Sequence, residues 1–210
     1  MVKLIIFDTW GTLIANGIYS PVKQVKFMLD IKDNFPEYIK RFEHVFMTKE
    51  YKSLEEGFKA VLKEFGIKQD KEIIEKLIGA WNKNTLLARP FRETIQVLED
   101  LKKDYKLALI SNTDSFSVPQ VIEKFGIEKL FDYVYLSCKE GKLKTETESF
   151  QKILKKLKVD SKDAVMIGDS IESDIKGAEL AGIRAILLDR RGRRDYIEKI
   201  MDLSELREKL

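Results

Sequence analysis

The stretch that decides the fold is Leu4-Ile5-Ile6-Phe7-Asp8-Thr9-Trp10-Gly11-Thr12-Leu13. Its first four residues, Leu4–Phe7, form an apolar run of the length expected for a buried strand. Asp8 follows directly, and Gly11 marks a turn three residues later. A carboxylate at the point where a buried strand opens into a turn is well placed for chemistry, so Asp8 is the first candidate nucleophile. Two residues after Asp8, where a second carboxylate would be its acid–base partner, the chain has Trp10.

Strand-like and helix-like segments alternate further along the chain. The strand-like runs are Leu4–Phe7, Leu107–Ile110, Tyr133–Leu136, Ala164–Ile167 and Arg184–Leu188. The helical patterns that accompany the later strands are Glu93–Lys103, Val118–Phe125, Thr147–Leu157 and Ile171–Ala181. This alternation predicts an α/β fold built on a doubly wound, Rossmann-like parallel sheet with right-handed crossovers.

The segment from residue 15 to residue 88 interrupts this alternation. It contains only helical patterns, at Pro21–Leu29, Pro36–Thr48, Ser53–Phe65 and Lys71–Leu86. Aromatic residues recur in it at roughly helical spacing, which predicts that most of them form a core of their own: Phe27, Phe35, Tyr38, Phe42 and Phe46. We therefore predict two domains: a sheet domain of residues 1–14 and 89–210, and a helical insertion of residues 15–88.

Composition limits the classes of function. The 210 residues are 44% apolar and 35% charged, and the net charge of +3 is too small to indicate a nucleic-acid partner. No apolar stretch reaches the roughly 18 residues of a membrane span, and no signal-peptide pattern follows Met1. The single cysteine, Cys138, excludes an internal disulfide and suits a reducing compartment. We therefore predict a cytoplasmic protein, with no nucleic acid or membrane as a partner. Composition does not distinguish a monomer from a homodimer, and both stay open.

Polar side chains follow the predicted strands at their carboxyl ends, where open parallel sheets bind ligands. In chain order they are Asp8, then Ser111, Asn112 and Thr113, then Lys144, and finally Asp169, Ser170 and Asp174. The three carboxylates suit Mg²⁺, which prefers oxygen ligands. Ser111 and Lys144 suit an anionic group. The joint placement of these residues at equivalent strand ends predicts one site.

These residues, in this order, resemble the four signature motifs of the haloacid dehalogenase superfamily. The stretch Phe7–Leu13 resembles the first motif, and Leu109–Asn112 resembles the second. Lys144 resembles the lysine of the third motif, and Gly168–Asp174 resembles the fourth. Arg89–Phe91, before a predicted helix, resembles the return from an α-helical cap inserted after the first motif. The resemblance spans nearly the whole chain and implies a Rossmann-like hydrolase core with such a cap.

The resemblance implies a two-step hydrolysis in which Asp8 attacks the substrate and forms an aspartyl intermediate that water then cleaves. It also implies Mg²⁺ as the cofactor in the phosphatases of the superfamily. The implied metal ligands are Asp8, the backbone carbonyl of Trp10, Asp169 and Asp174. The implied catalytic residues are Asp8, Ser111 and Lys144, and the implied substrate-binding residues are Thr9, Trp10, Gly11 and Asn112.

Trp10 departs from the phosphatase pattern, in which an aspartate protonates the leaving group and later activates water. An indole N–H has no usable acid–base equilibrium, and loss of a general acid costs about 10²–10⁴ in rate. Haloacid dehalogenases carry an aromatic residue at this position and need no metal. They also place an arginine soon after the first motif to bind the substrate carboxylate, whereas the first arginine here is Arg41.

The fourth motif points the other way, because Gly168-Asp169-Ser170 with Asp174 is of the phosphatase type. We therefore favour a Mg²⁺-dependent phosphatase of a small phosphorylated metabolite, working through an aspartyl-phosphate at Asp8. Trp10 predicts that it is slow or specialised for good leaving groups such as acyl phosphates. Two alternatives stay open: a metal-independent 2-haloacid dehalogenase, and a catalytically weak binding protein with a decayed site.

Overall fold

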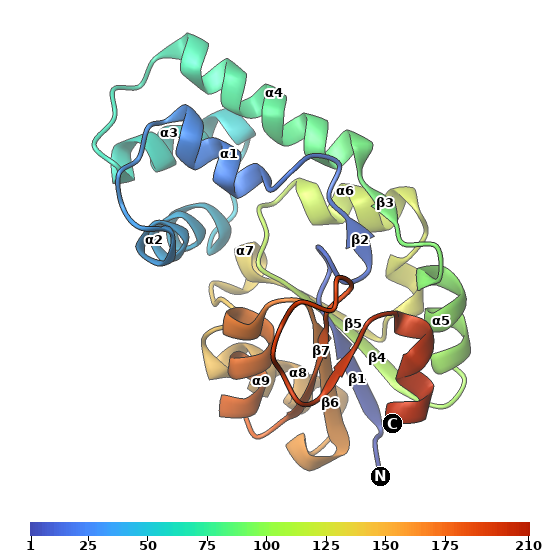
Figure 1. Ribbon diagram of the computed structural model, residues 1–210. Helices are drawn as coiled ribbons and strands as arrows, with labels where there is room; N and C mark the ends of the chain where they lie inside the picture. The colour runs from blue at the N-terminus through green and yellow to red at the C-terminus, as the bar shows by residue number, and fades with distance from the viewer.

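The computed structural model describes residues 1–210 and has a six-stranded sheet at its centre (Figure 1). The strand order is β5 (Tyr133–Leu136), β4 (Lys106–Ser111), β1 (Leu4–Phe7), β6 (Ala164–Gly168), β7 (Arg184–Leu188) and β8 (Lys199–Ile200). Every pair of neighbours is parallel. The chain adds β4 and β5 on one side of β1, then returns to add the other three strands on the opposite side. The predicted doubly wound parallel sheet is confirmed.

The side chains of β1 explain why both faces of the sheet are covered. All four are fully buried, and they alternate between two apolar clusters. Ile5 and Phe7 pack with α5 (Thr94–Leu101), α6 (Ser117–Lys124) and the C-terminal 3₁₀ helix η4 (Leu203–Lys209). Leu4 and Ile6 pack with α8 (Thr147–Leu157) and α9 (Lys176–Leu180). A strand buried on both faces reads as a continuous apolar run, which is what residues 4–7 are.

Four helices follow the first strand and gather at one end of the molecule, beyond the carboxyl end of β1 (Figure 1). They are α1 (Pro21–Met28), α2 (Phe35–Met47), α3 (Leu54–Glu64) and α4 (Lys71–Leu87). Each begins after a residue whose side chain accepts a hydrogen bond from a backbone N–H of the first turn, as N-caps do: Ser20, Asn34, Ser53 and Asp70. The helices surround an apolar cluster that is distinct from the two clusters of the sheet and takes in one residue that lies outside residues 15–88, Leu143.

The predicted aromatic core of these helices is present, with two exceptions. Tyr38, Phe42 and Phe46 are buried, and their rings pack against one another at a tilt along α2. Phe27 is 87% exposed and Phe35 is 39% exposed, so these two lie outside a core that was predicted for most of the five. Residues two apart on a helix point to nearly opposite sides, and on α1 the buried residue is Val25. Phe35 is the first residue of α2 and lies at the edge of the cluster.

A small antiparallel ribbon stands where the chain leaves the sheet for α1 and returns from α4. It pairs β2 (Ile14–Ala15) with β3 (Arg89–Pro90). The two passages of the chain also meet at Gly17, where a Cβ would lie 2.3 Å from the carbonyl oxygen of Asn84. The ribbon is absent from the sequence prediction, because two-residue strands have no periodicity.

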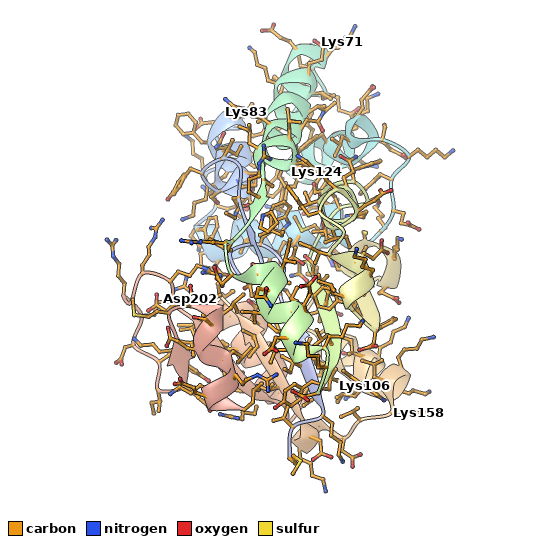
Figure 2. All side chains as sticks on the ribbon, turned by 90° about the vertical axis from the view of Figure 1, so that its right-hand side faces the viewer. Lys71, Lys83, Lys106, Lys124, Lys158 and Asp202 are labelled. Atoms are coloured by element: carbon orange, nitrogen blue, oxygen red, sulfur yellow. The ribbon has the colours of Figure 1, made fainter.

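Charged side chains cover the outside of the protein, as a 35% charged composition requires. The lysines labelled in Figure 2, at positions 71, 83, 106, 124 and 158, are all exposed. None of the helices combines the length and the apolarity needed to cross a membrane.

Candidate active site

The topology brings the sequence-predicted residues to one edge of the sheet. β4 and β6 flank β1 on either side, so the carboxyl ends of these three strands adjoin at the point where the strand order reverses. Asp8 follows β1, and its N–H donates to the Ile167 carbonyl of β6 at 2.9 Å. Ser111 ends β4, and Asp169 follows β6. Lys144 lies between α7 (Ser137–Glu140) and α8.

Three carboxylates meet at this edge. Oxygens of Asp8, Asp169 and Asp174 all lie within 4.8 Å of one another. Asp8 is 4% exposed and Asp174 is fully buried. Asp174 reaches the cluster from a π-helical turn, η3 (Ile171–Ile175), where its Oδ2 accepts a 2.9 Å hydrogen bond from the Ser170 N–H. The sequence predicted a regular helix here, whereas the structure has a π-helical turn that carries Asp174 and continues into α9.

Two glycines make room for this cluster. A Cβ on Gly11 would lie 2.4 Å from Asp169 Oδ2, and Gly11 has a φ of +80°. A Cβ on Gly168 would lie 2.3 Å from Asp174 Oδ2. A side chain at either position would collide with a carboxylate, so only glycine fits at these two positions without moving the cluster.

Lys144 is the cation of the site. Its Nζ lies 2.5 Å from Asp8 Oδ1 and 2.6 Å from Asp174 Oδ1, and its side chain is buried. Its backbone N–H donates to Asn112 Oδ1 at 2.9 Å, which links the lysine loop to the end of β4. The ammonium is therefore held between two carboxylates.

Burial and mutual repulsion shift the pKa values of these groups. Burial raises the pKa of Asp8 to about 7 against the opposing field of Lys144, and Asp174 and Asp169 add to the rise. Burial, followed by the charge of Asp174, raises the pKa of Asp169 to about 6. Burial alone would lower the pKa of Lys144, but Asp174 and Asp8 outweigh it and raise that pKa above its ordinary value.

Three carboxylates, of which Asp8 and Asp174 are buried and Asp169 is partly buried, thus lie around one ammonium. A divalent cation with a preference for oxygen ligands would offset the excess negative charge. The donor set, all carboxylate and without histidine or cysteine, fits Mg²⁺ rather than a softer metal.

Two buried hydroxyl groups and one carbonyl beside the carboxylates have unused hydrogen-bonding capacity. Ser111 Oγ and Thr9 Oγ1 are buried and have no hydrogen-bond partner in the protein. The carbonyl of Trp10 accepts no backbone hydrogen bond. Buried polar groups are seldom left without a partner, so these atoms are candidates for binding a ligand. The indole of Trp10 is partly buried and packs against the apolar cluster of α5 and α6.

One residue near the site has no counterpart among the residues singled out from the sequence. Glu43, on α2, accepts a 3.0 Å hydrogen bond at Oε2 from Asn112 Nδ2. It is a polar position on an amphipathic helix, the kind of residue that ordinarily faces solvent. Only the packing of α2 against the end of the sheet brings it here, so no sequence signal could have identified it.

Comparison with known proteins identifies the family. A family model for haloacid dehalogenase-like hydrolases matches residues 2–182. The glyceraldehyde 3-phosphate phosphatase of Methanothermobacter thermautotrophicus is 33% identical over 155 residues, which cover 69% of each chain. The crystal structure of an HAD phosphatase from Thermococcus onnurineus superposes with a TM-score of 0.66 at 25% identity, over 99% of this chain and 97% of that one. A 2-haloacid dehalogenase from Pseudomonas syringae shares the fold, with a TM-score of 0.65 at 23% identity and the same coverage. The chain belongs to the haloacid dehalogenase-like hydrolase family.

Proposed function

We propose that the protein is a Mg²⁺-dependent phosphatase that hydrolyses a small phosphorylated metabolite through an aspartyl-phosphate at Asp8. The observation that carries this proposal is the group of three buried or partly buried carboxylates, Asp8, Asp169 and Asp174, around one ammonium. Such an excess of buried negative charge suits an enzyme that binds a divalent cation. A relative named glyceraldehyde 3-phosphate phosphatase supports the same class and makes glyceraldehyde 3-phosphate the first substrate to test.

The residues of the site divide the chemistry among them. The three carboxylates and the Trp10 carbonyl would hold Mg²⁺, which when bound offsets charge on the transferring phosphoryl group. The Asp8 carboxylate attacks phosphorus, and the nearby ammonium of Lys144 favours the ionised form that attack requires. Ser111 Oγ donates a hydrogen bond to a phosphoryl oxygen. Water then cleaves the acyl phosphate and restores Asp8.

We infer that residues 15–88 act as a cap over this site. Support comes from their apolar cluster, to which the sheet domain contributes only Leu143, and from the β2–β3 ribbon where the chain leaves and re-enters the sheet domain. Trp81 of α4 also connects the helical segment to the sheet domain. Its Nε1–H donates to Asp114 Oδ2 and Ser117 Oγ, each at 2.9 Å, and both contacts are buried. A substrate enclosed between the helices and the sheet would be shielded from bulk water.

A dehalogenase is the second candidate, and the aromatic residue at position 10 favours it. That reaction needs a cation for the substrate carboxylate. Arg41, the first arginine of the chain, is held by Asp33 at 2.7 Å and Glu64 at 2.9 Å, with its guanidinium over the Phe65 ring. The charge of Arg41 is thus already paired within the helical segment and is not available to bind a substrate carboxylate. This supports the phosphatase over the dehalogenase.

The test compares three substrates with and without Mg²⁺. Purified protein is treated with chelator and assayed on glyceraldehyde 3-phosphate, acetyl phosphate and 2-chloropropionate, for release of phosphate or chloride. We expect phosphate release that requires Mg²⁺ and disappears in Asp8→Asn. Chloride release in chelator would establish the dehalogenase instead. Inertness toward all three substrates would leave a binding protein with a decayed site.

A further inference from the structure

Glu43 brings a carboxyl group from α2 to the edge of the active site. Its Oε2 accepts a 3.0 Å hydrogen bond from Asn112 Nδ2, directly after β4 and next to Ser111. The amide oxygen of the same asparagine accepts from the backbone N–H of Lys144 at 2.9 Å. Asn112 therefore holds Glu43 on one side and the loop of the active-site lysine on the other.

The direction from which Glu43 arrives matters for the reaction. In a phosphoryl transfer the attacking and leaving oxygens lie roughly in line, on opposite sides of phosphorus. Asp8 attacks from the end of β1, so the leaving oxygen faces away from the sheet. The helices α1–α4 lie on that side (Figure 1), and Glu43 is carried by α2.

The surroundings of Glu43 suit proton transfer. The side chain is partly buried, and the charged groups of the core that act on it are Lys144 and Asp174. Burial raises the pKa of Glu43 to about 7, although Lys144 and the hydrogen bond from Asn112 oppose the rise. A carboxyl group in this range both donates and accepts protons near neutral pH.

The usual position for the proton donor is occupied by a residue that cannot act. Trp10 offers only an indole N–H, and that ring packs into the apolar cluster. The one histidine, His44, is exposed on α2. The carboxylates of Asp8, Asp169 and Asp174 are already assigned to attack and to metal binding.

We propose that Glu43, carried by α2, is the general acid and base of this enzyme and does what Trp10 cannot; the proposal rests on the phosphatase function. In the first half-reaction Asp8 bonds to phosphorus, the bond from phosphorus to the leaving oxygen breaks, and that oxygen takes the proton of Glu43. In the second, the Glu43 carboxylate takes a proton from water as the water oxygen attacks phosphorus, and the bond to Asp8 breaks. One ester and one water give one alcohol and one inorganic phosphate, and both carboxyl groups return to their starting states.

The test is the dependence of rate on the leaving group. Glu43→Gln keeps the size of the side chain and an oxygen that can accept from Asn112, and it removes only the proton. We expect kcat on glycerol 1-phosphate, whose alkoxide leaves poorly, to fall about 10²–10⁴-fold. The leaving groups of 4-nitrophenyl phosphate and acetyl phosphate, 4-nitrophenolate and acetate, need no proton. The decrease in kcat on these two substrates should therefore be much smaller. Glu37→Gln, an exposed glutamate of the same helix, is the matched control and should behave like the parent protein.

A second variant and a measurement on the unmodified protein complete the test. Trp10→Asp in the Glu43→Gln background should restore turnover of glycerol 1-phosphate, because it returns a carboxyl group to the position next to the leaving oxygen. The unmodified enzyme should show a shallow dependence of kcat on leaving-group pKa across substituted phenyl phosphates, and Glu43→Gln a steep one.

Several outcomes would overturn the assignment of Glu43 while leaving the phosphatase intact. The first is a steep dependence of kcat on leaving-group pKa in the unmodified enzyme. The second is an equal loss of kcat in Glu43→Gln on every substrate, and the third is a change in Glu43→Gln that is confined to KM. If the unmodified protein with Mg²⁺ hydrolyses no member of the panel, the phosphatase function fails, and the role of Glu43 fails with it.

Discussion

Replacing one carboxylate of the candidate active site should make the metal-free protein more stable. Asp169 lies with Asp8 and Asp174 in a group whose oxygens are within 4.8 Å of one another. In the absence of metal the ammonium of Lys144 offsets part of their charge, and Arg194 adds a weaker positive field at Asp169. Asp169→Asn keeps the shape of the side chain and removes one negative charge. The variant therefore separates the cost of the charge cluster to folding stability from its proposed use in binding Mg²⁺.

The magnitude follows from the pKa of Asp169, which burial and Asp174 raise from 3.8 to about 6. The folded protein holds a proton between these two pH values that the unfolded chain has already lost. Its stability therefore falls as the pH rises through this window and stays low above it. A shift of roughly two pKa units corresponds to about 3 kcal/mol. Asparagine does not titrate, so the variant should gain nothing at pH 4 and up to about 3 kcal/mol at pH 7.5.

Thermal unfolding measures this gain. For a chain of this length each kcal/mol moves Tm by about 2–4 °C, so Asp169→Asn in chelator at pH 7.5 should unfold roughly 6–12 °C above the parent protein. Saturating Mg²⁺ should raise the Tm of the parent protein and have little effect on the variant. Asp195→Asn, at an exposed position outside the cluster, is the control. Equal Tm values in chelator, or a gain that is the same at pH 4 and pH 7.5, would refute the reasoning.

Two further predictions concern the frame of the site. Gly11→Ala should lower Mg²⁺ affinity by about 10–100-fold, because the new Cβ would lie 2.4 Å from the Asp169 carboxylate. The control is Gly66→Ala, which is also at positive φ but has open space around it. It should cost only about 1–2 kcal/mol of stability and leave Mg²⁺ affinity unchanged. Calorimetric titration and urea unfolding distinguish the two, and equal metal affinities would contradict the geometry. Trp81→Phe should lower the free energy of unfolding by about 1–3 kcal/mol, because it removes a buried donor to Asp114. An unchanged urea midpoint would show that this contact adds nothing to stability.

The core of the fold could be predicted because its signals are local. Each central strand is a short apolar run, and the carboxylate at the end of the first is visible in the sequence as Asp8. The β2–β3 ribbon, the short helix α7 and the strand β8 were missed. A two-residue strand has no alternation to detect, and a four-residue helix completes little more than one turn. The order of the strands in the sheet could also not be predicted from the sequence. It follows from parallel pairing on both sides of β1, which no single segment encodes.

The candidate site shows the same division between local and non-local information. Asp8, Lys144, Asp169 and Asp174 could be selected because each follows a strand, and equivalent strand ends meet in space. Glu43 could not, because its neighbour Asn112 is 69 residues away and α2 has the pattern of an ordinary amphipathic helix.

A sequence motif describes residues that lie close together along the chain. The motif around Asp8 therefore indicates that a proton donor is missing at position 10, and it says nothing of a donor carried by another element. A proton donor needs only to reach the leaving oxygen, and a helix inserted after the first strand can carry one there. The aromatic residue at position 10 therefore does not by itself decide between a phosphatase and a dehalogenase. The decision depends on what the inserted helices place opposite Asp8.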